Sequence, residues 1–179
     1  MYITKVDGKI IERRELNKRE CTLYDLDMLV KFQEEVNEYN TLKNIFGSYS
    51  YDELLRIINT ENAFCYLYYD DNVFVGFLLI DNAVASEEYE EYEIKHIDRC
   101  KTAIYAAVMI NPKYWGNGLQ RQISKEAEDT IANKGYKYIV ITVSPINVYS
   151  YNNFKQLEYK IISEKDLSFG HRYIMYKEV

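Results

Sequence analysis

Residues 109–128 read MINPKYWGNGLQRQISKEAE, and this stretch decides the fold. It begins at the end of an apolar run, residues 102–110, that is typical of a strand buried on both faces. A proline then stops the strand, and Gly116 and Gly118 mark a turn. From Leu119 onward an apolar residue recurs every four positions, which predicts a helix. The stretch therefore predicts a buried strand, a glycine turn and a helix in direct succession.

The turn between this strand and this helix is a candidate phosphate site. The first N–H groups of a helix have no acceptor within it and carry the positive end of its dipole. Glycines let a phosphate approach the backbone, and Arg121 and Lys125 lie one turn further along. The pattern fits neither GxGxxG nor the GxxxxGK[ST] of nucleotide-hydrolysing proteins. Taken alone, residues 112–120 fit either a phosphate site or a plain structural turn.

A second segment lies about thirty residues further along. Residues 138–143, YIVITV, predict another buried strand, and strand, helix, strand in succession predicts a right-handed crossover with the two strands parallel. The next residues, SPINVYSYNNFKQLEYKI, predict a short helix. Four of its side chains project to one side, at the mouth between the two strands: Asn147, Ser150, Tyr151 and Phe154. The alternative is that Asn147 only caps this helix and Phe154 only packs in the core.

The rest of the chain alternates between strands and helices without a repeat or a linker. Gly76 interrupts a strand, which indicates a bulge or a close backbone approach. Residues 86–99 are polar and acidic, and we expect an exposed connection there. We also expect an opening strand at residues 9–16, a hairpin of strands at residues 64–69 and 73–80, and closing strands near residues 159–162 and 172–176. Two helices should begin at capping boxes, one formed by Thr22 with Asp25 and the other by Ser50 with Glu53.

Length and composition predict one globular domain spanning residues 1–179, with 47% hydrophobic and 28% charged residues. The apolar run at residues 73–80 is far shorter than the roughly 20 residues of a membrane span, and residues 1–15 lack the apolar core of a secretory signal. We therefore expect a cytoplasmic protein without a membrane partner. The three cysteines and two histidines show neither a disulfide framework nor metal-ligand spacing, so we expect no metal.

The net charge of −6 argues against nucleic acid as a partner, because such binding needs a basic surface. A cationic substrate would be steered favourably by the same charge. The acidic run formed by Glu87, Glu88, Glu90, Glu91 and Glu93 fits a solvated loop, or a group of carboxylates that approaches such a substrate.

Together the two segments resemble the GCN5-related N-acetyltransferase (GNAT) family. The family's V-x-P-x-[YF]-R-G-x-G-[IL]-[GA] turn is matched at Ile110, Pro112, Tyr114, Gly116, Gly118 and Leu119. Its later N-x-x-[AS]-x-x-x-[YF]-x-x-x-G-[FY] helix is matched at Asn147, Ser150, Phe154 and Tyr159. The order of elements agrees over nearly the whole chain. The resemblance implies an α/β (α+β) fold with a mixed, largely antiparallel sheet, a central splayed pair of parallel strands, and flanking helices.

The resemblance also implies a function. A member of this family would transfer an acetyl group from acetyl-CoA to a primary amine of a small molecule or peptide, by direct attack of the amine on the thioester. The amide of Ile110 would polarise the thioester carbonyl, and the family leaves a homodimer open. The residues implied in CoA binding are Met109, Ile110, Trp115, Gly116, Asn117, Gly118, Leu119, Gln120, Arg121, Asn147, Ser150 and Phe154.

The chain departs from the family pattern at positions that matter for catalysis. Trp115 stands in place of arginine or glutamine, and Gln120 stands in place of glycine or alanine. Phe154 occupies the position of the tyrosine that protonates the CoA thiolate in many members, so Tyr151 or Tyr149 would have to supply that hydroxyl. The strand before the turn carries no acid to serve as general base.

Two alternatives to an N-acyltransferase stay open. One is a non-catalytic module that binds acyl-CoA, or another partner, with the same fold. The other is a different nucleotide-handling protein that binds phosphate at its helix N-terminus.

Overall fold

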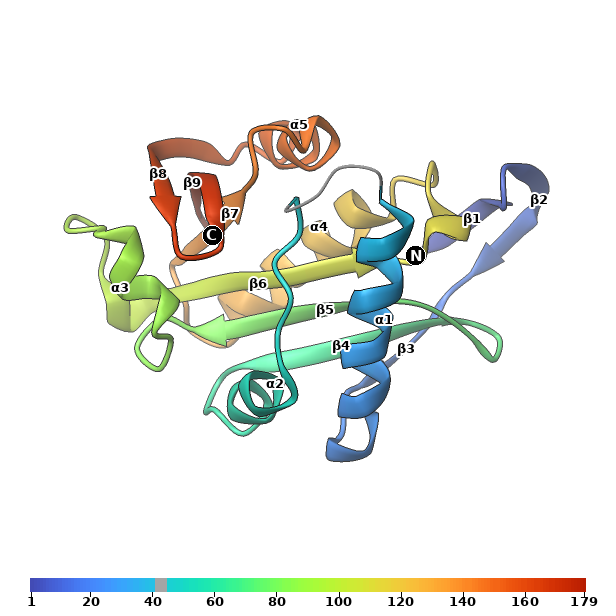
Figure 1. The fold of residues 1–179 in the computed structure, drawn as a ribbon, viewed down its shortest axis with the longest axis horizontal. Helices are drawn as coiled ribbons and strands as arrows, with labels where there is room; N and C mark the ends of the chain where they lie inside the picture. The colour runs from blue at the N-terminus through green and yellow to red at the C-terminus, as the bar shows by residue number, and fades with distance from the viewer. Residues whose placement is uncertain (41–44) are drawn as a thin grey trace.

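The computed structural model describes residues 1–40 and 45–179, and a mixed sheet forms its centre (Figure 1). This part of the chain holds seven strands in the main sheet, mostly antiparallel, with one parallel pair, β6–β7. Helices cover both faces, as expected. The strand order is β3 (Asn17–Glu20), β4 (Phe64–Asp70), β5 (Val73–Asn82), β6 (Thr102–Ile110), β7 (Tyr138–Val143), β9 (Gly170–Glu178) and β8 (Lys160–Leu167).

Two helices pack on one face of the sheet and one long helix packs on the other (Figure 1). Leu29 of α1 and Leu54 of α2 are fully buried against Phe77 of β5 and its neighbours. On the opposite face, Ile123 of α4 is fully buried against the other side chains of the strands. The bounds are α1 (Leu26–Tyr39), α2 (Tyr51–Ile58), α3 (Glu88–Tyr92), α4 (Leu119–Asn133) and α5 (Val148–Gln156), with short 3₁₀ turns η1 (Leu23–Asp25), η2 (Arg99–Lys101) and η3 (Pro112–Tyr114).

The parallel pair separates part of the way along. β6 and β7 pair from Thr102 with Tyr138 to Tyr105 with Ile141, and beyond that point β6 pairs only with β5. Ala106 is an extra residue in β6, because the β5–β6 register shifts there, and such a β-bulge bends its strand. The predicted splay between two parallel strands is therefore present, and it begins at this bulge.

The close approach expected at Gly76 is present. A Cβ atom on Gly76 would lie 2.2 Å from the carbonyl oxygen of Met109, so the residue must be glycine where β5 meets the end of β6. The β4–β5 register also shifts beside it, between Tyr68 and Tyr69. The two alternatives predicted for Gly76, a bulge and a close backbone contact, are therefore both present.

Both predicted capping boxes form, at Thr22 with Asp25 and at Ser50 with Glu53. The two closing strands appear as a β8–β9 hairpin, in which β9 lies between β7 and β8. Among the described residues, no helix combines the length and the apolar character needed to cross a membrane.

Two expectations from the sequence need correction. The strand expected at residues 9–16 forms as β2 (Lys9–Glu15), but it does not open the fold, because β1 (Tyr2–Val6) precedes it and pairs with it in a separate two-stranded sheet. The connection at residues 86–99 is only partly exposed. Its short helix α3 buries Tyr89 and Tyr92, whose rings share a third apolar cluster with residues of β6, β7 and β9.

Candidate functional site

The glycine turn between β6 and α4 has the geometry of an anion site. Gly118 has a left-handed backbone (φ 65°) and stands at the N-cap of α4 without a capping side chain. Gly116 is also left-handed, with a φ of 83°. Such values favour glycine, and a bare N-cap leaves the first amides of the helix open to a ligand. A Cβ on Gly118 would find its nearest neighbour at 3.8 Å, so the space above the helix N-terminus is open.

Contacts from distant segments hold this turn in place. The Asn117 side chain donates to the carbonyls of Lys5 and Tyr114 at 2.7 and 2.9 Å, and it accepts from the amides of Thr4 and Lys5. The Tyr114 hydroxyl donates to the buried Asp70 carboxylate at 3.0 Å. The indole of Trp115 donates to the carbonyl of Ile110 at 2.9 Å. The turn is therefore anchored to β1, to β4 and to the end of β6.

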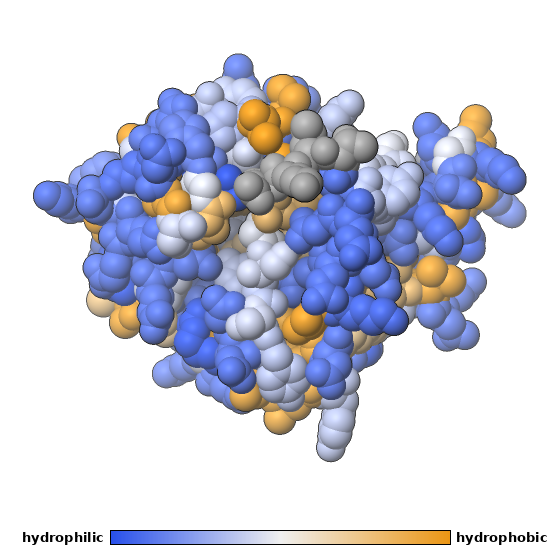
Figure 2. Space-filling view, viewed as in Figure 1, coloured by the Kyte–Doolittle hydropathy of each residue, from blue (hydrophilic) through white to orange (hydrophobic). Residues whose placement is uncertain are grey.

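Two cavities open along the splayed strands. The outer cavity, about 680 Å³, lies over the glycine turn and is lined by Ile110, Trp115, Gly116, Gly118 and Leu119 together with the start of α5. The inner cavity, about 400 Å³, lies between the separated ends of β6 and β7 and extends to α3. Figure 2 shows the face that includes α1 and α3, where hydrophilic side chains predominate.

Six described residues line both cavities and mark the place where they meet: Ile45, Phe46, Val108, Gln120, Asn147 and Ser150. Gln120 donates to the Ser150 hydroxyl at 2.9 Å and accepts from Asn153 at 2.7 Å. A side chain therefore crosses from α4 to α5 at this junction.

The structure brings most of the sequence-derived candidates to these cavities. Met109 and Phe154 line the inner cavity, and the other lining candidates are named above. Asn147 accepts a hydrogen bond from the amide of Ser150, and Phe154 is fully buried between Tyr105 and Tyr159. Asn147 therefore caps its helix and Phe154 packs in the core, and both residues also line the inner cavity.

Three candidates line neither cavity. Asn117 instead holds the glycine turn against β1 by the hydrogen bonds described above. Arg121 donates a hydrogen bond to Gln156 on α5. The ring of Tyr151 packs on Tyr173, with 5.6 Å between the ring centroids. Tyr149, the other tyrosine considered, is 85% exposed and lines the outer cavity.

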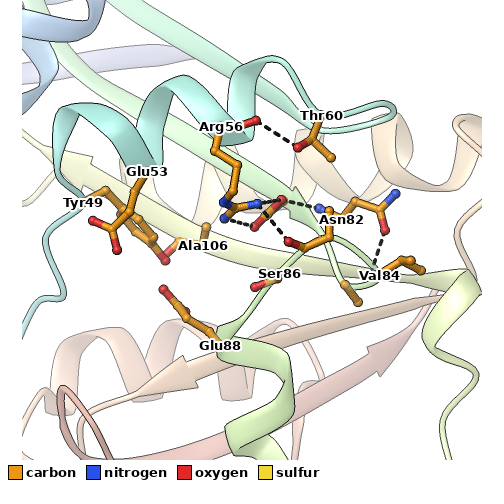
Figure 3. Close-up of polar contacts among 12 residues, drawn as sticks. Tyr49, Glu53, Arg56, Thr60, Asn82, Val84, Ser86, Glu88 and Ala106 are labelled. Atoms are coloured by element: carbon orange, nitrogen blue, oxygen red, sulfur yellow. Dashed lines mark hydrogen bonds and ion pairs between the residues drawn. The ribbon is translucent and has the colours of Figure 1, made fainter.

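The inner cavity has a polar wall, in which the sequence had named Glu88 within the acidic run but had given no sign of Tyr49. Tyr49 lines it, and its hydroxyl donates to the carbonyl of Ala106 at 3.3 Å, at the bulge of β6. Glu88 lines the same wall and accepts from the hydroxyl of Tyr92 at 3.0 Å. In Figure 3 the Glu88 carboxylate and the Tyr49 hydroxyl point toward one another. Burial raises the pKa of Glu88 above its usual value, while the hydrogen bond from Tyr92 and the facing Tyr49 hydroxyl lower it.

The position of Tyr49 depends on Gln33 of α1. Gln33 is 1% exposed, and its side-chain amide donates to the carbonyl of Tyr49 at 3.0 Å and accepts from its N–H at 2.9 Å. We call these two hydrogen bonds the Gln33 clamp. One feature of the sequence indicates it, because Gln33 is a polar residue within the apolar stripe that contains Leu29 and Val36.

A splayed parallel pair that meets a glycine-capped helix N-terminus is the arrangement that the family resemblance predicted. The sequence profile described as the acetyltransferase (GNAT) family matches residues 29–159. That match covers most of the chain, and the chain belongs to the acetyltransferase (GNAT) family.

Solved structures share the fold. An acetyltransferase of the GNAT family from Streptococcus pneumoniae matches with a TM-score of 0.66 at 19% identity, over 92% of this chain and 99% of that one. Aminoglycoside acetyltransferase AAC(6')-Ib, in complex with coenzyme A and kanamycin, matches with a TM-score of 0.69 at 14% identity, over 92% and 95% of the chains. A putative acetyltransferase from Salmonella typhimurium, solved with its cofactor acetyl-CoA, matches with a TM-score of 0.67 at 12% identity, over 92% and 94%. The comparison with curated proteins found no match.

Proposed function

We propose that this protein is an acyl-CoA-dependent N-acyltransferase, which transfers an acetyl group from acetyl-CoA to a primary amine of a small molecule or peptide. The observation that carries the proposal is the end of the β6–β7 pairing at Tyr105 and Ile141, from which β6 continues without β7 to Ile110 and the glycine turn. This gap leads from the anion site into the inner cavity, which suits a long cofactor with a phosphate at one end and a reactive thioester at the other.

In this proposal the CoA diphosphate binds the amides at the start of α4, over Gly116 and Gly118. The pantetheine arm lies along the end of β6, where strand amides no longer pair with β7. The thioester then reaches the junction at Val108 and Ser150, and an amide of residues 108–110 polarises its carbonyl. The inner cavity receives the amine.

The mechanism is direct attack, without an acyl-enzyme. The amine nitrogen forms a bond to the thioester carbon, and the carbon–sulfur bond breaks as the thiolate leaves. We give Tyr151 no part in this step, because it packs on Tyr173 outside both cavities. Tyr149 at the outer cavity is the candidate that protonates the thiolate.

The inner cavity also favours a cationic acceptor, since Glu53, Glu87, Glu88 and Glu91 line it together with Arg56 and Arg172. Structures of similar fold include aminoglycoside acetyltransferase AAC(6')-Ib in complex with kanamycin. One domain spanning residues 1–179, a cytoplasmic location and a homodimer stay predictions from the sequence.

Two measurements test the proposal. Calorimetry should show that acetyl-CoA binds in preference to ATP and NAD, and preference for either nucleotide would contradict the assignment of the turn to CoA. Thiol release should then depend on an acceptor in a panel of spermidine, kanamycin, lysine and a tripeptide with a free N-terminus. Binding of acetyl-CoA without thiol release for any amine would favour the non-catalytic module, which Phe154 and the acid-free β6 motivate.

A further inference from the structure

Glu88 differs from the other carboxylates of the acidic run. Glu90 and Glu93 form ion pairs with Arg99 and Lys165 on the surface. Glu91 accepts hydrogen bonds of 2.8 Å from the backbone and side chain of Ser168. Three of the five acidic residues therefore already have partners, although Glu91 also lines the inner cavity, and Glu87 is exposed.

Glu88 lines the inner cavity as Glu87 and Glu91 do, but its carboxylate faces the Tyr49 hydroxyl and is partly withdrawn from solvent (Figure 3). Within residues 1–40 and 45–179, no lysine or arginine forms an ion pair with it. Arg56, the nearest cation on α2, is paired with the buried Asp81 at 2.8 Å. The Tyr92 hydroxyl on the same helix donates a hydrogen bond to Glu88, and the Tyr49 hydroxyl ahead of α2 faces the carboxylate.

This position is opposite the place where the reaction would occur. The Tyr49 hydroxyl lies between Glu88 and the carbonyl of Ala106, at the bulge where β6 leaves β7. The same cavity is lined by Val108 and Ser150, where the proposed thioester lies. An amine between the thioester and α3 would therefore have Glu88 as a wall of its pocket.

We infer that Glu88 is the proton acceptor for the incoming amine, and that Tyr92 and Tyr49 are positioning residues for its carboxylate. This inference rests on the proposed function. The Glu88 carboxylate takes one proton from the ammonium form of the acceptor, which yields a neutral amine and a carboxylic acid. The amine forms the C–N bond, and sulfur leaves with the electron pair of the C–S bond. Tyr149 gives its proton to the thiolate, and the proton released by the new amide nitrogen restores the Tyr149 hydroxyl.

The surroundings of Glu88 suit this role. Burial is the largest cause that raises its pKa, and the carboxylates of Asp81 on β5 and Glu53 on α2 raise it further. The hydrogen bond from Tyr92 and the facing hydroxyl of Tyr49 lower this pKa, and Arg56 faces the same group from α2. A carboxylate with a raised pKa is a stronger base while still ionised near neutral pH.

Glu88→Gln tests the inference, because it keeps the shape of the side chain and removes the base. At neutral pH we expect kcat to fall about a hundredfold or more, with unchanged acetyl-CoA binding by calorimetry and an unchanged thermal unfolding midpoint. The matched control is Glu90→Gln, which makes the same charge change on the outer side of α3 and should leave kcat within about twofold.

The pH profile separates a base from a structural residue. In the wild type, kcat/KM falls as the pH drops through the pKa of Glu88, and this fall is the acidic limb of the profile. The Glu88→Gln variant should lack the acidic limb. Its rate should rise only at a pH high enough for the free amine to be neutral. Tyr92→Phe removes a hydrogen bond that lowers the pKa of Glu88, so the limb should move to higher pH. Glu88→Asp should keep the limb at a lower rate.

The outcomes are distinguishable. If the wild type releases thiol and Glu88→Gln keeps its rate and its pH profile, the role of Glu88 is overturned while the acyltransferase stands. If the wild type binds acetyl-CoA and releases no thiol with spermidine, kanamycin, lysine or the tripeptide, both the enzyme and its base are overturned.

Discussion

Gln120 donates a hydrogen bond of 2.9 Å to the hydroxyl of Ser150, and this contact joins the first turn of α4 to α5 between the two cavities. Family members have glycine or alanine at the position of Gln120, so the bridge distinguishes this chain from the family pattern. The side chain holds α5 in place, whereas the backbone of the same turn forms the proposed phosphate site.

Gln120→Ala should separate these two contributions. The substitution removes hydrogen bonds to Ser150 and Asn153, and we expect the free energy of unfolding to fall by about 1–2 kcal/mol in denaturant titrations. Asn153→Ala removes only one of them and should cost about half as much. Acetyl-CoA affinity should change less than about threefold, because backbone amides bind the diphosphate. A tenfold loss of affinity would show that the side chain itself contacts the cofactor.

Gly118→Asp and Gly118→Asn form a matched pair at the helix N-cap. Both side chains tolerate the left-handed backbone better than most and have similar size, so they share any cost of strain. Only aspartate adds a negative charge beside the proposed diphosphate. Calorimetry should show acetyl-CoA binding at least about tenfold weaker for the aspartate variant than for the asparagine variant. Equal affinities would place the diphosphate elsewhere.

Gln33→Leu should show what the clamp on Tyr49 contributes to stability. The substitution leaves the N–H and C=O of Tyr49 without their partner beside a fully packed helix. We expect a loss of about 2 kcal/mol or more in the free energy of unfolding, measured with denaturant. The control is Asn37→Ala one turn later, which removes an exposed hydrogen bond to Ser48 and should cost less than about 0.5 kcal/mol. Similar losses in the two variants would contradict the role of the clamp.

Asp25 should make the free energy of unfolding depend on pH in the acidic range. The Arg19 guanidinium, which donates two hydrogen bonds to Asp25, lowers the pKa of this carboxyl to about 2. A carboxyl whose pKa is lower in the folded state stabilises the protein above its unfolded pKa of roughly 4, and the contribution is lost as the pH falls toward 2.

Asp25→Asn should therefore be less stable than the wild type at pH 7 by about 1–2 kcal/mol, a figure reduced for the exposure of Arg19. Denaturant titrations between pH 7 and pH 2 should show this difference shrink as the pH falls through about 4 to 2. Asp27→Asn on the exposed side of α1 is the control and should give a small difference. A difference that stays constant with pH would exclude the ion pair as its cause.

The sequence by itself determined the elements whose causes are local. Apolar runs placed β6 and β7, and the capping residues Thr22 and Ser50 placed the starts of the first two helical segments. Gly116 and Gly118 marked the turn, because a left-handed backbone near a helix start favours glycine in any tertiary context. The glycine turn and the later helix pattern from Asn147 to Tyr159, in this order of elements, indicated the family, and the resemblance implied its splayed sheet.

Only the tertiary structure decided the polar wall of the site. Glu88, Tyr49 and Ala106 are far apart in the chain, and no local pattern relates them, so their meeting depends on how α3 and the segment before α2 pack on β6. The bulge at Ala106 lies in an ordinary apolar run, since a register shift belongs to a pair of strands and not to one. Periodicity and turn chemistry report on neighbours in sequence, whereas a catalytic pocket is made of neighbours in space.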